Sequence, residues 1–154
     1  AHREEIAAEP LFDERMHLVV HRSHPLAQRR SMGMRELADV PLALLPASFA
    51  TRRLIDDAFA QAQTKPLVRV EMESVDALLL ACRHAPLATI AAEHAALNAG
   101  DGMCAIALNE PGAVRRAGVL WRDGASRSAA AQEFVALLKP AVAKAQARNA
   151  AAFT

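Results

Sequence analysis

Short apolar runs that alternate with helical segments are the feature that most constrains the fold of this chain. The run PLALL (41–45) contains no polar residue, as is typical of a strand covered on both faces. In the segment that follows, from 51 to 62, apolar residues recur at helical spacing on one face: Leu54, Ile55, Ala58, Phe59 and Ala62. The alternation predicts an α/β fold with mainly parallel strands.

The same reading applied along the chain predicts its other elements. Strands are expected at 16–22, 41–45, 67–72, 86–91, 103–111 and 115–122. A short helix or turn is expected at 34–40. Helices are expected at 51–62, at 75–84 after a Ser74 cap, at 91–98, and from Ser126 or Ser128 onward. Pro140 is expected to kink or interrupt the last helix, and the alanine-rich tail beyond it is expected to fray.

Composition excludes several classes of protein. The 154 residues are 53% hydrophobic and 23% charged, which is typical of a soluble globular chain of one domain or two small lobes. With 18 basic and 17 acidic residues the net charge is +1, so nothing favours nucleic-acid binding by this chain itself. The sequence predicts no membrane span, and its polar start, AHREEIAAEP, predicts no signal peptide.

No set of residues for catalysis, a cofactor or a metal stands out. The motifs GxxxxGK[ST], GxGxxG, GxSxG, HExxH and CxxC are absent from the sequence. Cys82 and Cys104 are expected to be buried, reduced thiols, since each lies in an apolar run. His17 and His21 are expected on an exposed strand face, and the neighbouring carboxylates Asp13 and Glu14 are interpreted as solvated charges.

The stretch PASFATRRLID (46–56) is the best candidate for a binding site. A helix that opens directly after a strand presents unpaired N–H groups and a partial positive charge. Ser48 and Thr51 could cap that helix or donate to a ligand, and Arg52 adds a cation suited to a small anion. The alternative is an ordinary helix start in which Arg52 only pairs with Asp56.

A second corner has the same design. Ser74 follows the strand at 67–72 and precedes the helix at 75–84. In open α/β sheets, ligands bind outside the carboxyl ends of the strands. Two such corners in one lobe therefore favour a ligand site over two unrelated helix starts.

Several stretches resemble the effector-binding domain of LysR-type transcriptional regulators. They follow in family order: EPLFDERMHLVVHRSHPLA (9–27), ELADVPLALLP (36–46), VEMESVDALLLACR (70–83) and RRAGVLWRDGASRSAAAQEF (115–134). The resemblance spans residues 9–140. Three further stretches are most similar to the cyanate-responsive subgroup of that family: FATRRLID (49–56), RHAPLATIAAEHAAL (83–97) and GMCAIALNEP (102–111).

The resemblance implies a two-lobe fold like that of type 2 periplasmic binding proteins. It implies a complete second lobe at 23–114 and a partial first lobe made of 1–22 and 115–154, the latter a return strand, a closing helix and a frayed tail. It also implies that a small effector binds between the lobes. The residues that match the family's cleft walls are Ser48, Phe49, Ala50, Thr51, Arg52, Glu73, Ser74, Val75 and, on weaker correspondence, Thr89.

The implied function is effector sensing that controls transcription through a winged helix-turn-helix domain not present in this chain. The effector is expected to be a small anion, such as cyanate or a small carboxylate. A cytoplasmic homodimer or homotetramer is implied, with the helix at 51–62 as a candidate contact. Two other hypotheses are a solute-binding protein of the same fold and an α/β enzyme; the sequence disfavours the enzyme because it offers no catalytic residues, cofactor motif or metal ligands.

Overall fold

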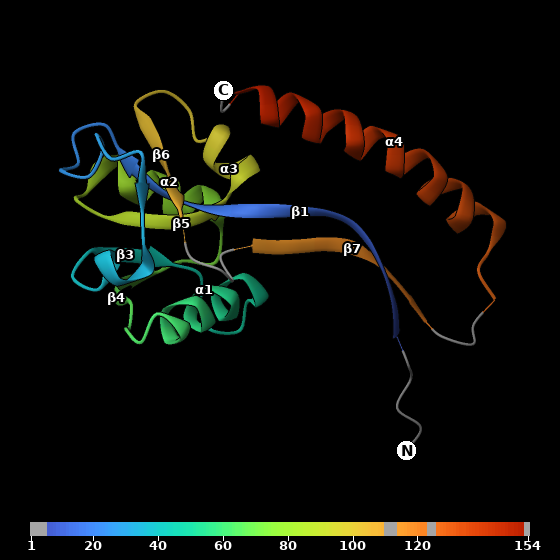
Figure 1. Cartoon of the computed structure of the whole chain (residues 1–154), viewed down its shortest axis with the longest axis horizontal. Coiled ribbons are helices and arrows are strands. Elements are labelled where there is room, and N and C mark those ends of the chain that lie inside the picture. The colour runs from blue at the N-terminus through green and yellow to red at the C-terminus, as the bar shows by residue number, and fades with distance from the viewer. Residues whose placement is uncertain (1–5, 110–113, 123–125, 153–154) are drawn as a thin grey trace, which may run out of the picture. The chain divides into compact units, whose positions relative to one another are not determined.

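Two compact units make up the chain in the computed structural model, which describes residues 6–109, 114–122 and 126–152. Unit 1 comprises Ala1–Asp13 and Arg116–Thr154, and unit 2 comprises Glu14–Arg115. Two strands, β1 (Ile6–His21) and β7 (Val114–Arg122), each contribute residues to both units (Figure 1). The chain therefore passes between the units twice.

Unit 2 is a mixed sheet with helices between its strands, where the sequence predicted mainly parallel strands. Its other elements are β2 (Ser31–Met32), the 3₁₀-helix η1 (Met34–Leu37), β3 (Pro41–Leu44), α1 (Ala50–Gln61), β4 (Leu67–Glu71), α2 (Val75–His84), β5 (Ala88–Ala92), α3 (Glu93–Leu97) and β6 (Met103–Leu108). The strand order is β2-β6-β1-β5-β3-β4. The β3–β4, β3–β5 and β2–β6 pairs are parallel.

The departure from a parallel sheet lies in β1, which is antiparallel to β5 and to β6, its two neighbours in this strand order. The strand β7 also pairs with β1. Val19 lies opposite Thr89 of β5 on one side and opposite Ala105 of β6 on the other. Because β1 enters from unit 1 and occupies the middle of the sheet, its direction could not be read from the βα alternation of the segments that follow it.

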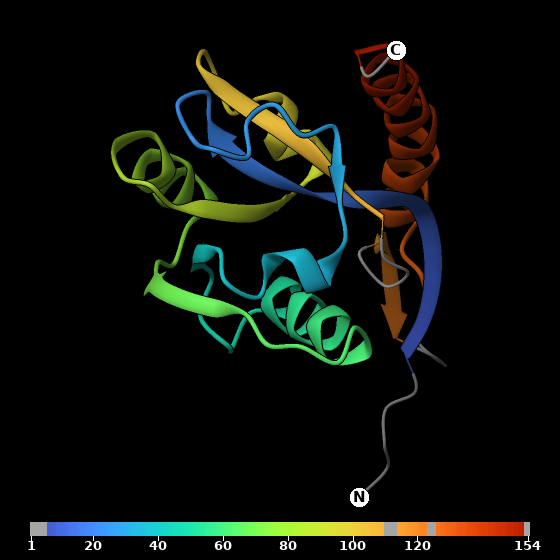
Figure 2. The same ribbon diagram turned by 60° about the vertical axis from the view of Figure 1, so that its left-hand side comes forward.

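The unit 2 core lies on both faces of this sheet (Figure 2). On one face, Leu18 and Val20 of β1 pack in a cluster with Ile55 and Phe59 of α1. The other face carries residues of alternate parity, with Val19 beside Leu79 of α2 and Ala96 of α3, and Ala43 and Leu45 beside Leu78 and Cys82 of α2. The predicted strand runs are thus covered on both sides, as an uninterrupted apolar pattern requires.

Burial within β1 corrects two expectations from the sequence. His17 is 5% exposed and Glu14 is 2% exposed, although both were expected to face solvent. The buried part of β1 begins at Glu14, before the apolar run that predicted this strand, so two polar side chains are enclosed with the apolar ones. Cys82 is buried as expected, and burial raises the pKa of its thiol to about 12. Cys104 was also expected to be buried but is only partly so.

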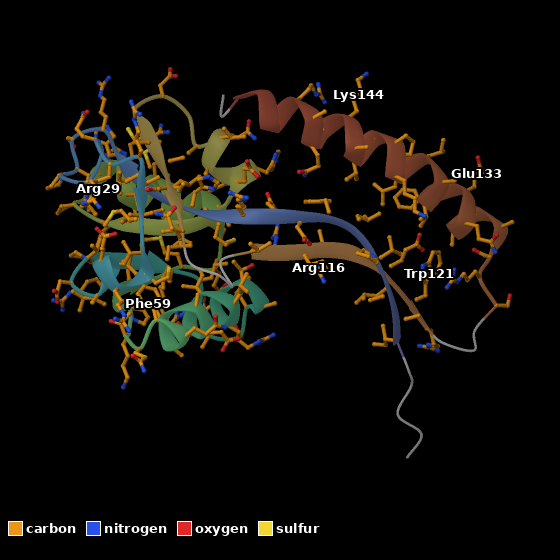
Figure 3. The ribbon with its side chains drawn as sticks, viewed as in Figure 1. Arg29, Phe59, Arg116, Trp121, Glu133 and Lys144 are labelled. Atoms are coloured by element: carbon orange, nitrogen blue, oxygen red, sulfur yellow. The ribbon has the colours of Figure 1, made fainter. Side chains whose placement is uncertain are left out.

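Unit 1 contains the outer part of β1, the strand β7 and the helix α4 (Ala129–Ala152). Ser128 accepts a hydrogen bond from the Ala131 N–H at 3.2 Å, which confirms one of the two expected caps. The Trp121 Nε1 atom donates to the Glu9 carboxylate at 3.0 Å (Trp121 is labelled in Figure 3). Lys139 of α4 forms an ion pair with the same carboxylate.

Helix α4 continues past Pro140, which the sequence analysis expected to kink or interrupt it. The helix runs without a break from Ala129 to Ala152, with Pro140 inside it. A proline removes one helical hydrogen bond, and on an exposed face water can satisfy the carbonyl that is left. Pro140 is exposed, so water can reach the carbonyl that loses its helical hydrogen bond. Among the described residues, no helix is both long enough and apolar enough to cross a membrane.

Candidate functional site

A pocket of about 100 Å³ in unit 2 brings residues of the two predicted corners together. Thr51 comes from the first turn of α1, after β3, and Val75 is the first residue of α2, after β4. The remaining lining residues are Glu14, Leu45, Leu78, Ile90, Ala91, Ala92, His94, Ala95 and Arg115. All of these residues belong to unit 2. A pocket therefore lies at the strand ends where the sequence predicted a binding site.

The first corner differs in detail from the prediction. The N-cap of α1 is Phe49, in extended conformation, and no side-chain hydrogen bond caps this end. Ser48 precedes the cap and Thr51 lies within the helix, so neither residue caps it as expected. In the described part of the chain the Thr51 hydroxyl has no protein hydrogen-bond partner, which leaves it available to a molecule in the pocket.

Arg52 does not line this pocket, although it was the cation proposed for an anionic ligand. Its side chain turns to the protein instead: Nε donates to Asp56 at 3.0 Å, and Nη1 donates to the Leu45 carbonyl at 2.7 Å and to Glu71 at 2.6 Å. Burial lowers the pKa of this guanidinium, but the hydrogen bonds to Glu71 and Asp56 outweigh it and hold the pKa above its ordinary value. The pair of Arg52 with Asp56, which the sequence left open as the alternative, is therefore present.

The second corner matches the prediction in its cap. The Ser74 Oγ atom accepts a hydrogen bond from the Ala77 N–H at 3.2 Å and so closes the first turn of α2. Ser74 and its neighbour Glu73 are exposed, and neither lines the pocket. The corner contributes Val75 alone to the wall.

Thr89 lies apart from the pocket, within the sheet. It is 0% exposed, and its Oγ1 has no hydrogen-bond partner in the described structure. It sits on β5 opposite Val19, while the pocket is lined by the later β5 residues Ile90, Ala91 and Ala92. Of the nine predicted residues, the structure brings together Thr51 and Val75. The seven that do not line the pocket are Ser48, Phe49, Ala50, Arg52, Glu73, Ser74 and Thr89.

Two charged residues of the pocket wall, Glu14 and Arg115, were not among the residues predicted from the sequence. The Glu14 Oε1 atom accepts from the His94 N–H at 2.9 Å, in the first turn of α3, and Oε2 accepts from Arg115 Nη2. A buried carboxylate is stabilised by such donors. Strand parity was a usable signal, because Glu14 shares its face with Met16 and Leu18, which belong to the core.

Among the described residues, no group of three or more His, Cys, Asp or Glu side chains is arranged to hold a metal ion. The pocket wall contains the Thr51 hydroxyl and the ion pair of the Glu14 carboxylate with the Arg115 guanidinium, beside apolar side chains. These groups can bind a small molecule by hydrogen bonds and apolar contact.

Comparison with known proteins identifies the family. Residues 1–143 match the family described as the LysR substrate binding domain, so the chain belongs to that family. The transcriptional dual regulator GltC of Bacillus subtilis (strain 168) is 32% identical over 74 residues, which are 48% of this chain and 25% of GltC.

Solved structures of similar fold include the Synechocystis PCC6803 CcmR regulatory domain in complex with 2-PG, with a TM-score of 0.81, 20% identity, and coverage of 92% of this chain and 69% of that chain. The effector binding domain of QuiR in complex with shikimate has a TM-score of 0.78 and 22% identity, and the match covers 90% of this chain and 66% of that chain. A Corynebacterium glutamicum OxyR mutant has a TM-score of 0.80 and 23% identity, with 96% of this chain and 47% of that chain covered.

These matches confirm the expected α/β fold of the type 2 periplasmic-binding-protein kind. The matched residues span a quarter of the length of GltC and about half of the OxyR chain. At these identities the solved structures establish the fold alone.

Proposed function

We propose that this chain is the effector-sensing part of a LysR-type transcriptional regulator and that its effector contacts the unit 2 pocket. The observation that carries the proposal is the meeting of Thr51 and Val75, from two separate strand-to-helix corners, in one pocket wall. CcmR and QuiR have this fold and their structures hold small molecules, 2-PG and shikimate. Family membership adds to the same reading.

Within the predicted set we assign direct contact to Thr51 and Val75. Ser48, Phe49, Ala50, Glu73 and Ser74 flank them in sequence, and we propose that these form the edge of the site. We assign structural roles to Arg52, whose hydrogen bonds are made to protein groups, and to Thr89, which is enclosed in the sheet.

In the intact regulator, unit 2 is proposed to be the second lobe and unit 1 part of the first. The effector would favour one of two lobe arrangements by its differential contacts, and so change the spacing of DNA-binding domains in a cytoplasmic dimer or tetramer. DNA would be bound only by a winged helix-turn-helix domain outside this chain. The α1 helix remains a proposed dimer contact, and the protein is proposed to have no enzymatic activity.

The effector is proposed to be a small anion. Cyanate is one candidate, on the resemblance of three stretches to the cyanate-responsive subgroup, and a small carboxylate is the other. A solute-binding protein of the same fold is the second candidate function, but the match to the LysR substrate binding domain over residues 1–143 favours the regulator.

Calorimetry on the intact regulator tests the proposal, with cyanate, azide and a series of small carboxylates as ligands. We expect heat of binding with at least one of them. Thr51→Val should weaken that binding by about 1–3 kcal/mol, the range for a hydrogen bond to a charged group. Thr64→Val is the matched control, because Thr64 lies beyond the other end of α1 and does not line the pocket. Absence of heat with every ligand would contradict the anionic class of effector.

A further inference from the structure

We infer that Arg115 is the anion-recognising residue of the unit 2 pocket, and that the ligand it selects is a carboxylate carrying a small apolar group. The inference rests on the proposed function and deepens it, since it names the ligand class of the same pocket. It transfers to Arg115 the role that the sequence suggested for Arg52. The two arginines differ in how their side chains are held.

Arg115 lies in the pocket wall, and most of its N–H groups make no hydrogen bond within the described structure. Its side chain is 44% exposed, against 11% for the side chain of Arg52. A guanidinium has five N–H donors. Within the described structure, Arg115 gives one hydrogen bond, from Nη2 to Glu14. Arg52 donates hydrogen bonds to Asp56, Leu45 and Glu71, and it does not line this pocket.

Glu14 fixes the position of this guanidinium. Its carboxylate is enclosed, and its other oxygen is held by the His94 N–H at 2.9 Å, so it is anchored to the start of α3. An arginine oriented by a fixed carboxylate loses less side-chain freedom when it binds a planar anion. Glu14 is therefore a positioning residue, and Arg115 is the residue that would touch the ligand.

Charge balance in the pocket limits which anions can bind well. Glu14 offsets the charge of Arg115, so the pair contributes no net charge to the wall. A small inorganic anion gains little from a neutral pair, because most of its hydration must be replaced by directed hydrogen bonds. Net attraction then has to come partly from apolar contact.

The rest of the wall supplies such contact. Most of its side chains are apolar: Leu45, Val75, Leu78, Ile90, Ala91, Ala92 and Ala95. A volume of about 100 Å³ fits a group of a few carbon atoms. Thr51 adds a hydroxyl that can donate to a second carboxylate oxygen. These features together favour a carboxylate with a small apolar group over cyanate, azide or a neutral analogue.

The test is an NMR titration of the full 154-residue chain, read at the backbone amides of Thr51, Val75 and Ala92. Three probes separate charge from shape: 3-methylbutanoate, its neutral amide 3-methylbutanamide, and azide. We expect 3-methylbutanoate to shift these amides and the other two probes to bind at least about tenfold more weakly, as loss of a charge-assisted hydrogen bond implies.

Variants separate the roles of the two residues. Arg115→Gln should weaken 3-methylbutanoate binding by about tenfold to a hundredfold. Since that change leaves Glu14 enclosed without its partner, the double variant Glu14→Gln/Arg115→Gln repeats the test with a neutral pair. Arg116→Gln is the matched control: Arg116 is the next residue of β7, pairs with Asp13 at 2.8 Å, and belongs to unit 1 (Figure 3).

Glu14→Gln alone keeps an acceptor for the His94 N–H and removes the offsetting charge. We expect azide binding to strengthen by about tenfold in this variant, because the pocket then carries an unbalanced cation. A purely structural role for Glu14 would not produce that gain.

The outcomes distinguish this inference from the proposed function. Unchanged 3-methylbutanoate affinity in both Arg115 variants, or equal binding of the acid and its amide, would overturn the role of Arg115 while leaving the pocket as an effector site. Absence of shifts at the pocket amides with all three probes would also overturn the inference. The proposed function fails by a different measurement, the calorimetry on the intact regulator.

Discussion

The Arg52 Nη1 atom donates a 2.6 Å hydrogen bond to Glu71, and this pair ties α1 to the end of β4. The same nitrogen donates to the buried carbonyl of Leu45, just after β3, at 2.7 Å. One side chain thus joins three segments that meet at the strand ends. These bonds hold together the corner from which Thr51 lines the pocket.

Arg52→Met is expected to lower the free energy of unfolding by about 1.5–3 kcal/mol, because the Leu45 carbonyl loses a charged donor. The two carboxylates are partly exposed, at 39% for Asp56 and 48% for Glu71. Water can therefore replace much of the hydrogen bonding that they lose with Arg52, and their contribution to the change is small. Urea unfolding followed by far-UV circular dichroism measures the change. Arg53→Met is the matched control and should stay within about 0.5 kcal/mol, since Arg53 is exposed. Equal losses in the two variants would contradict the structural role of Arg52.

Ser74→Ala should destabilise unit 2 by about 1 kcal/mol, the usual value of a serine N-cap. Its hydroxyl accepts the Ala77 N–H, which otherwise has no acceptor in the first turn of α2. Ser48→Ala serves as the comparison, because Phe49 rather than Ser48 is the N-cap of α1 and no side chain caps that helix. We expect less than about 0.5 kcal/mol from that change. A loss for Ser48→Ala as large as that for Ser74→Ala would mean that the Ser48 hydroxyl caps α1 in solution.

Local patterns in the sequence predicted most of the helices and strands and one of the two caps at the site. The run at 41–45 became β3, the helical face around Phe59 became the core side of α1, and Ser74 caps α2 as expected. These features depend on residues a few positions apart, where periodicity and capping chemistry act. The expected pair of Arg52 with Asp56 is also of this kind, and it forms at 3.0 Å.

Pairs of residues far apart in the sequence could not be predicted from local patterns. Glu14 and Arg115 are brought together by the neighbouring strands β1 and β7, and no local pattern links positions so far apart. The cap of α1 failed for a different reason: two polar residues near a helix start suggested a cap, but the chain turns at Phe49 and leaves both outside that role. The central, antiparallel place of β1 likewise depends on the sheet as a whole.

Gly118→Ala is expected to destabilise unit 1 by about 1–3 kcal/mol, as added atoms in a tightly packed place usually do. A Cβ at this position would lie 2.7 Å from the Glu9 carbonyl oxygen and 3.3 Å from the Pro10 Cα atom. Both are backbone atoms, so β1 and β7 would have to move apart.

Trp121 is the single tryptophan of the chain and lies on β7, so its fluorescence during urea unfolding reports on unit 1. Leu120→Ala is the control on the same strand, because Leu120 is 67% exposed and its truncation should cost less than about 0.5 kcal/mol. A fluorescence midpoint for Gly118→Ala equal to that of the unaltered chain would show that the strands have room at this position.

His17 should make the protein less stable as the solution is acidified. Burial lowers its pKa below the ordinary value of 6.5, and this effect outweighs the nearby Glu93 carboxylate, which raises it. Above about pH 7 the imidazole is neutral in both folded and unfolded chains, so it has no effect on the pH dependence. As the pH falls through 6.5 the unfolded chain takes up the proton first, and stability is lost until the folded pKa is passed.

His17→Leu removes this proton uptake, so its free energy of unfolding should fall less than that of the unaltered chain between about pH 7 and pH 5. Burial also lowers the pKa of His24, so His24 contributes to the pH dependence of stability equally in the variant and in the unaltered chain. Urea midpoints measured by circular dichroism at several pH values give the comparison, with His84→Leu as the control because His84 is exposed. Parallel pH profiles for His17→Leu and the unaltered chain would mean that His17 accepts its proton as readily in the folded protein as in the unfolded one.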